Sequence, residues 1–120
     1  MSYLIISFSH KNTDIEMREK LAFGSDDDKD RFLKLILGND VTKEAVLLST
    51  CNRVEIITRS INPKTSAKFI LGELSKYSGV DYDLLYKRAD IYDTESSVHH
   101  LFSVASALDS LVIGETQIVG

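Results

Sequence analysis

The chain has one cysteine, Cys51, and its setting suits a reactive thiol. The apolar run before it ends at Leu48, and its nearest neighbours are all polar: Ser49, Thr50, Asn52 and Arg53. The charge of Arg53 would stabilise a thiolate and lower the thiol pKa. A thiolate that attacks an ester gives a thioester. Free cysteines are also commonly buried as inert apolar side chains, so the residues alone leave both interpretations open.

His100 is the second residue that could do chemistry. A helix from about Ser97 would have one apolar face: Val98, Leu101, Phe102, Ala105, Leu108 and Val112. His100 would project from the opposite side, together with Ser103, Ala107 and Ser110. That surface suits a substrate wall, and it equally suits an ordinary solvated face. Nothing else in the sequence supports a catalytic role for His10 or His99.

Other polar groupings indicate structure rather than catalysis. Arg53 and Glu55 are spaced to form an ion pair on the surface of a strand. The acidic run 26–28 fits a helix start, where acidic side chains complement the helix dipole, better than a metal site. The sequence has no metal-spaced Cys/His set, no phosphate-binding glycine loop and no dinucleotide fingerprint. We therefore expect no metal site and no cofactor site in this chain.

Local patterns predict the elements that must position these residues. Alternating or continuous apolar runs predict strands at 3–8, 45–49, 54–58 and 88–92. Helical spacing and capping residues predict helices at 15–23, 27–37 and 63–78, a helical turn at 82–86 and a last helix from about 97. Either Thr13 or Asp14 would cap the first helix, and either Thr94 or Ser96 the last. The short connection 50–53 would join the second and third strands as a hairpin.

This order of elements predicts an α+β fold, a ferredoxin-like βαββαβ antiparallel sheet with extra helices. We expect this domain to cover residues 1–93. Residues 94–120 would form a helical segment that completes the active site. The sequence is still apolar at Gly120, without a cap or polar tail, which favours continuation into further protein.

Composition places limits on the class of protein. Of the 120 residues 43% are hydrophobic and 27% charged, and the net charge is −4, which together fit one globular domain. No apolar run reaches the roughly 18 residues of a membrane span, and no signal peptide is evident. A lone cysteine and no export signal favour the cytoplasm. A negative domain without a basic stripe would contact RNA only locally.

Three blocks of the sequence together resemble the glutamyl-tRNA reductase family, whose reaction opens the five-carbon route to tetrapyrroles. The first is Ser9-His-Lys with Arg18-Glu-Lys-Leu-Ala-Phe23, and the second is Leu48-Ser-Thr-Cys-Asn-Arg-Val-Glu55. The third runs from His100 to Gly120 and contains Leu108-Asp-Ser-Leu-Val-Ile-Gly-Glu115. They span nearly the whole chain in the order and spacing of the family.

The resemblance implies a reaction and a set of site residues. Cys51 would attack the ester between glutamate and the tRNA 3′ end, giving a glutamyl thioester that NADPH reduces to glutamate-1-semialdehyde. His100 matches the active-site histidine, proposed to position or activate the acyl group. The glutamate pocket would be lined by Thr50, Asn52, Arg53, Ser110, Glu115, Thr116 and Gln117. A buried carboxylate needs a bidentate cation, which Arg53 can provide.

The resemblance also implies partners. Glutamyl-tRNA would be the substrate, and NADPH would be bound by a domain after Gly120. The whole protein would be a homodimer and could pass its product to the downstream aminomutase. This chain alone should then form the thioester and lose it to water. The family usually has Gly at the positions of Ser7 and Ala107 and Arg at that of Ser103, so the pocket shape could differ.

Two other functions remain open at this point. The chain could be a cysteine hydrolase that uses Cys51 and His100 on ordinary esters or peptides, although no third residue is evident to orient the histidine. It could also be a non-catalytic module for a small ligand or RNA, because ferredoxin-like sheets serve many functions. In that case Cys51 would be inert.

Overall fold

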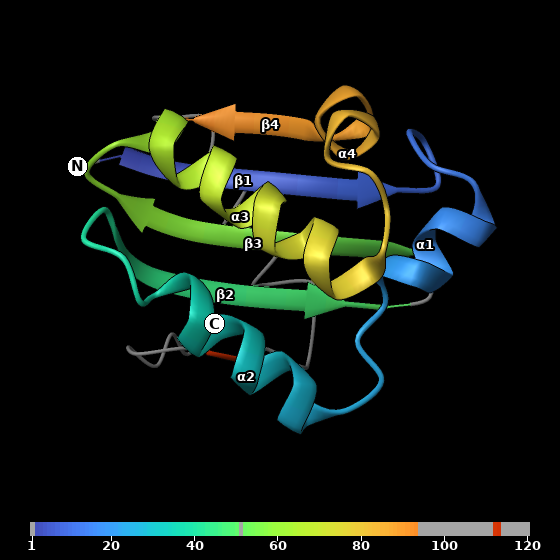
Figure 1. Ribbon diagram of the computed structural model, residues 1–120, viewed down its shortest axis with the longest axis horizontal. Coiled ribbons are helices and arrows are strands. Elements are labelled where there is room, and N and C mark those ends of the chain that lie inside the picture. The colour runs from blue at the N-terminus through green and yellow to red at the C-terminus, as the bar shows by residue number, and fades with distance from the viewer. Residues whose placement is uncertain (1, 51, 94–111, 114–120) are drawn as a thin grey trace.

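The chain forms an antiparallel β-sheet with helices packed against one of its faces (Figure 1). The computed structural model describes residues 2–50, 52–93 and 112–113. The strands are β1 (Ser2–Ser9), β2 (Thr42–Ser49), β3 (Arg53–Ser60), β4 (Asp90–Asp93) and β5 (Val112–Ile113). The helices are α1 (Ile15–Leu21), α2 (Asp26–Ile36), α3 (Pro63–Ser78) and α4 (Tyr82–Arg88).

The strand order is β4-β1-β3-β2-β5, and every neighbouring pair is antiparallel. The first four strands follow the order of a ferredoxin-like sheet, with β1 and β3 at the centre. The predicted α+β fold with its antiparallel sheet is therefore confirmed. The predicted hairpin is confirmed as well, since β2 and β3 pair from Thr42 and Ser60 to Ser49 and Val54.

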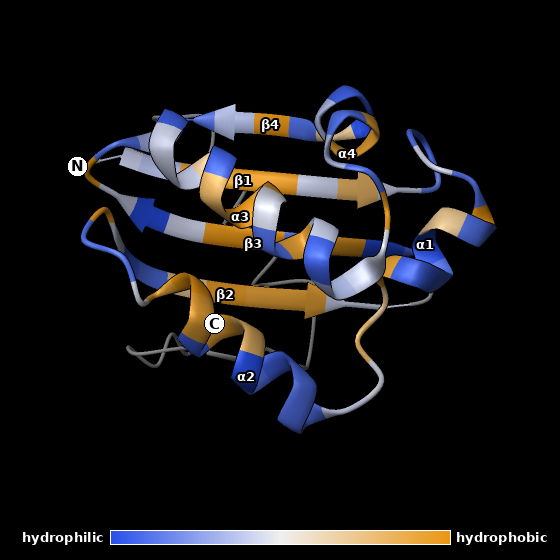
Figure 2. Ribbon diagram, viewed as in Figure 1, coloured by the Kyte–Doolittle hydropathy of each residue, from blue (hydrophilic) through white to orange (hydrophobic). Residues whose placement is uncertain are grey.

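The main core lies between the sheet and the helices. Alternate residues of β1 and β3 meet across the ladder on this face, for example Ile6 opposite Ile56 and Phe8 opposite Val54. Helices α2 and α3 lie in front of the sheet in Figure 1, and both carry apolar residues among polar ones in Figure 2. Leu33, Ile70 and other fully buried side chains of these helices belong to the same cluster. Burial of one apolar face per element is what holds this layer together.

Capping residues set the helix starts close to where the sequence predicts them, although α1 ends at Leu21 rather than at Phe23. Asp14, not Thr13, caps α1, because its Oδ1 accepts a hydrogen bond of 2.8 Å from the Met17 N–H. Asn62 caps α3, and Pro63 takes the first helical position, where its missing N–H costs nothing. Helix α3 ends at Gly79, which has φ of 77°. This left-handed conformation is unfavourable for other residues.

The second face of the sheet also carries buried apolar side chains. Four side chains that point away from the helices form a separate buried cluster: Ile5, Val46, Leu48 and Ile57. Their burial explains why the strand sequences read as continuous apolar runs rather than as strict alternation.

One element was predicted wrongly. We expected Val112 to lie on the apolar face of a helix, but Val112 and Ile113 form β5 and pair with Leu47 and Val46. Pairing satisfies backbone groups at the edge of β2, and β-branched residues suit a strand. The rest of the predicted C-terminal helix, residues 94–111 and 114–120, lies outside the described residues. None of the described helices is long and apolar enough to cross a bilayer.

Candidate functional site

The turn between β2 and β3 is the centre of the candidate site. The Thr50 N–H donates to the Arg53 carbonyl at 2.8 Å, which closes the turn. The Thr50 hydroxyl accepts hydrogen bonds from the N–H groups of Asn52 at 3.3 Å and Arg53 at 3.2 Å. Cys51 itself lies outside the described residues. Its two neighbours in the chain thus belong to a turn whose backbone is held by a side chain of the turn itself.

The loop after β1 lies beside this turn. The His10 N–H donates to the Asn52 carbonyl at 3.2 Å, which joins the two loops directly. The loop is held in shape by Asn12, whose Oδ1 accepts from the Ser9 N–H at 2.7 Å and whose Nδ2 donates to the Ser7 carbonyl at 3.0 Å. The first two sequence blocks therefore meet at one end of the sheet, the end where α1 lies in Figure 1.

A buried carboxylate, that of Glu55, anchors the Arg53 side chain. Its Nη1 donates to Glu55 Oε1 at 3.1 Å, and the Ser7 hydroxyl donates to the same oxygen at 3.1 Å. The Glu55 side chain is 2% exposed, whereas that of Arg53 is 36% exposed. The predicted Arg53–Glu55 pair is confirmed, but its placement on the surface is wrong for Glu55. The guanidinium is thus fixed at one side and reachable from solvent.

This arrangement suits recognition of a carboxylate. A guanidinium has five N–H donors in a rigid fork, and the contact with Glu55 uses one of them. The remaining donors can bind an anionic group in the bidentate manner that distinguishes arginine from lysine. Polar atoms of Thr50 and Asn52, both exposed, lie in the same turn.

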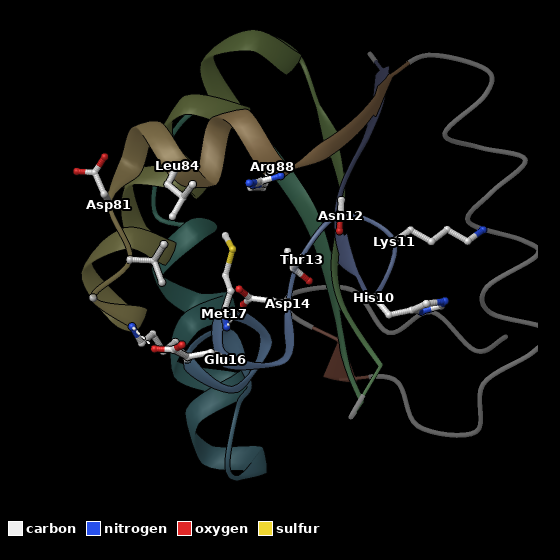
Figure 3. A pocket seen from close by; sticks show the side chains of 13 residues that line it. His10, Lys11, Asn12, Thr13, Asp14, Glu16, Met17, Asp81, Leu84 and Arg88 are labelled. Atoms are coloured by element: carbon white, nitrogen blue, oxygen red, sulfur yellow. Dashed lines mark hydrogen bonds and ion pairs between the residues drawn. The ribbon is translucent and has the colours of Figure 1, made fainter.

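A large cavity lies nearby but is not lined by this turn. It has a volume of about 600 Å³ and is bounded by the loop 10–14, α1, the connection 79–81 and α4. In Figure 3 the side chains of Met17, Leu84 and Arg88 surround this space. Its lining contains three acidic residues (Asp14, Glu16 and Asp81) and three basic ones (Lys11, Lys20 and Arg88), so it has no strong preference for an anion. Of the two loops of the site, the β1–α1 loop lines this cavity and the β2–β3 turn does not.

The described residues contain only part of the predicted site. Thr50, Asn52 and Arg53 come together in the β2–β3 turn. Six predicted site residues lie outside the described residues: Cys51, His100, Ser110, Glu115, Thr116 and Gln117. Ser103 and Ala107 lie outside them too.

The site also includes Glu55 and Ser7, which were not predicted as site residues from the sequence. The available signal was a carboxylate between Val54 and Ile56 in the middle of an apolar strand, a position where a charge is expensive unless it is paired.

The described part of the chain offers no metal or dinucleotide site. Among residues 2–50 and 52–93, no three His, Cys, Asp or Glu side chains are grouped to hold a metal ion. Asp26 and Asp28 lie in the first turn of α2 and pair with Lys29 at 3.6 Å and Arg31 at 3.8 Å. A Rossmann-type dinucleotide site has a glycine-rich turn between a parallel strand and a helix, and the described sheet is antiparallel. The described residues therefore do not fit NADPH bound in that manner.

Comparison with known proteins identifies the sequence pattern. A family model described as glutamyl-tRNAGlu reductase, N-terminal domain, matches residues 6–120. A glutamyl-tRNA reductase of Aliarcobacter butzleri is 78% identical over 120 residues, which are 100% of this chain and 28% of that protein. One from Campylobacter hominis is 54% identical over the same share of both. This chain thus spans about 28% of the length of these curated relatives.

A solved structure gives the same assignment for the fold. The glutamyl-tRNA reductase from Methanopyrus kandleri aligns with a TM-score of 0.55 and 30% sequence identity. The alignment covers 90% of this chain and 23% of that one.

Proposed function

Because this chain belongs to the family of glutamyl-tRNA reductase N-terminal domains, we propose that it carries out the acylation step of that enzyme. The Cys51 thiolate attacks the ester carbonyl of glutamyl-tRNA. A C–S bond forms, the bond to the tRNA 3′-terminal oxygen breaks, and that oxygen takes up a proton. The products are a glutamyl thioester on Cys51 and free tRNA.

The observation that carries this proposal is the anchored guanidinium of Arg53, two residues after the only cysteine of the sequence. The Arg53 backbone closes the turn that contains Cys51, through the 2.8 Å bond with Thr50. Its side chain is held by Glu55 and remains 36% exposed. In a glutamyl ester the side-chain carboxylate is free, and Arg53 is the group we assign to bind it. Its charge also favours the thiolate form of Cys51.

The other assignments rest on the family resemblance. Thr50 shapes the turn, and Asn52 adds polar contacts to the bound glutamyl group. His100 positions or activates the acyl group, while Ser110, Glu115, Thr116 and Gln117 complete the pocket. We assign residues 1–93 to the ferredoxin-like part and 94–120 to the segment that completes the site, with the strand β5 inside it.

The proposal for the whole enzyme goes further than this chain. There, NADPH reduces the thioester to glutamate-1-semialdehyde, the first step of tetrapyrrole synthesis by the C5 route. The described residues do not fit NADPH bound in the Rossmann manner. A homodimer and transfer of the product to the aminomutase are likewise proposals for the whole protein.

Transfer of label from tRNA to protein tests the proposed step. The chain is mixed with glutamyl-tRNA that carries radiolabelled glutamate, quenched in acid and separated from tRNA. We expect label on the protein, release of that label by hydroxylamine, and no label on Cys51→Ser or Cys51→Ala. Labelled glutamate that appears in solution at the same rate with Cys51→Ala would contradict the proposal.

A further inference from the structure

We propose that Glu55 and Ser7 are positioning residues that orient Arg53, and that they thereby set the preference for a glutamyl over a glutaminyl group. This inference rests on the proposed function and names the residues that control its substrate selectivity. Neither residue needs to touch the substrate. Both act through the guanidinium of Arg53.

The three side chains lie in line on one face of the sheet. Ser7 on β1 is directly opposite Glu55 on β3 in the antiparallel register, and Leu48 of β2 is opposite Glu55 on its other side. Arg53 precedes Glu55 by two residues, so both point to the same face. Glu55 therefore lies at the centre of the sheet, at the boundary between the buried cluster around Ile57 and the exposed guanidinium.

One oxygen of Glu55 receives both donors. The Ser7 Oγ and the Arg53 Nη1 each lie 3.1 Å from Oε1. A carboxylate oxygen with two donors from two strands has little freedom to rotate. Hydrogen bonds between charged groups are also stronger and more directional than neutral ones. The guanidinium is therefore held in one orientation before any substrate arrives, which reduces the entropy lost on binding.

The position is an expensive one for a carboxylate. Glu55 is 1% exposed and follows Val54 in a strand that is otherwise apolar up to Ile57. Burial of a charge costs more than burial of an apolar side chain of similar size, and buried ion pairs are commonly replaced by apolar residues without loss of stability. Orientation of Arg53 gives a functional reason for a carboxylate at this position.

Orientation matters because carboxylates and amides differ in geometry. A fixed guanidinium fork offers two parallel donors that match the two oxygens of a carboxylate. A glutaminyl amide presents one oxygen and one NH₂ group, so one donor of the fork would face another donor. A loosely held arginine could turn away from that clash, and selectivity would fall.

The chain provides a matched control at the other end of the same strand. Arg59 Nη2 lies 3.0 Å from Glu44 Oε1, and Arg59 is 38% exposed. This pair also joins an arginine of β3 to a carboxylate at nearly the same distance as Arg53–Glu55, although Glu44 lies on β2 and its side chain is 22% exposed. It lies about 20 Å away along the strand, too far to contact a substrate bound at the β2–β3 turn.

The test compares acylation of Cys51 by the same tRNA charged with glutamate or with glutamine, in the full-length protein. Rates are measured against tRNA concentration for wild type, Glu55→Gln, Ser7→Ala and Glu44→Gln, with thermal unfolding in parallel. We expect Glu55→Gln to lower kcat/KM for the glutamyl substrate about tenfold, mostly through KM, and to leave the glutaminyl value within about twofold. Ser7→Ala should lower it about threefold and Glu44→Gln not at all.

Other results would overturn the inference. Loss of the negative charge of Glu55 would by itself attract a carboxylate more strongly, so a higher kcat/KM in Glu55→Gln means that charge and not orientation matters. An equal loss of kcat/KM for the glutamyl and the glutaminyl substrate in Glu55→Gln would mean that Glu55 has a merely structural role. If Glu55→Gln does not fold, the ratio in Ser7→Ala decides, and an unchanged ratio rejects the inference. Absence of label on the wild-type protein would instead reject the proposed function itself, and this inference with it.

Discussion

Arg53 has two tasks at the residue scale, one toward the protein and one toward the substrate. Its contact with the buried Glu55 leaves most of its donors free to meet a carboxylate. Lysine at this position would keep the charge but would lose the fork and the reach that the Glu55 contact requires. A lysine substitution at position 53 therefore separates the contribution of the positive charge from that of the guanidinium geometry.

This distinction gives a prediction for Arg53→Lys. We expect KM for glutamyl-tRNA in the acylation of Cys51 to rise about tenfold or more, because the bidentate contact is lost. The maximal acylation rate should change much less, since lysine keeps the positive charge at position 53. Initial rates of label transfer against substrate concentration measure both. Arg59→Lys serves as the control, and an equal rise of KM in both variants would show that the Arg53 site has no special part in binding.

At the scale of the elements, substitutions of two glycines, one inside α3 and one at its end, compare the cost of backbone strain with that of low helix propensity. Gly72 lies inside α3, and Gly79 ends that helix with a φ of 77°. A Cβ at either position would meet no heavy atom within 4 Å. Space is therefore equal at the two positions, and only the backbone conformation differs.

We expect opposite effects from the same substitution at these two positions. Gly72→Ala should raise the free energy of unfolding by about 0.5–1 kcal/mol, because alanine favours the helix. Gly79→Ala should lower it by about 1–2 kcal/mol, because alanine disfavours positive φ. Urea unfolding measures both. A stabilising effect of Gly79→Ala would mean that the helix does not end in the left-handed conformation described here.

Tyr77 links α3 to the segment after α1 and gives the fold a dependence on pH. Its ring stacks on Phe23 with centroids 4.4 Å apart, and its hydroxyl donates to the Ala22 carbonyl at 2.9 Å. Burial, and secondarily the carboxylate of Asp28, raise the pKa of the Tyr77 phenol above its ordinary value. The folded state thus holds this proton more tightly than the unfolded state.

The sign of this effect follows from linkage. The stability from the neutral phenol is fully present below the unfolded pKa of about 10, and it is lost as pH rises through the folded pKa. Tyr77→Phe should cost about 1 kcal/mol at neutral pH through the lost hydrogen bond. It should also remove part of the loss of stability in alkali. Urea unfolding at several pH values checks this, with the exposed Tyr86→Phe as control. Parallel alkaline losses in wild type and Tyr77→Phe would contradict it.

Local sequence patterns predicted most of these elements, but they did not predict contacts between strands that are far apart in the sequence. Pro63 and Gly79 marked the two ends of this helix in the sequence, and α3 runs from Pro63 to Ser78 in the structure. The burial of Glu55 depends on its neighbours Ser7 and Leu48, which come from other strands. No local pattern contains that information. The strand at Val112 was missed for the same reason, since its partner is Leu47.

At the scale of the whole molecule, the strands β1, β2 and β3 carry buried side chains on both faces of the sheet. Ile5 and Ile6 are adjacent in β1, point to opposite faces and are both 0% exposed. A two-layer protein with a wet second face would bury only one of them. The β2–β3 turn and Arg53 therefore extend from a sheet that is rigid on both sides, which suits a site that depends on orientation.

We predict that Ile5→Ala and Ile6→Ala each lower the free energy of unfolding by about 2–5 kcal/mol. Both side chains leave a cavity in a closely packed cluster. Ile61→Ala should change it by less than about 0.5 kcal/mol, because Ile61 is 53% exposed. Urea unfolding monitored by circular dichroism compares the three. A small effect of Ile5→Ala alone would mean that the second face is accessible to water.

The covalent step is the central claim, and its stoichiometry tests it most directly. Glutamyl-tRNA is mixed rapidly with excess protein, and free tRNA and protein-bound glutamate are followed in the same quenched samples. If Cys51 is the nucleophile, each tRNA released is matched by one glutamyl group on the protein at early times, with equal rate constants for the two. Free tRNA that appears together with free glutamate, without a protein-bound phase, would contradict the account and favour direct attack by water.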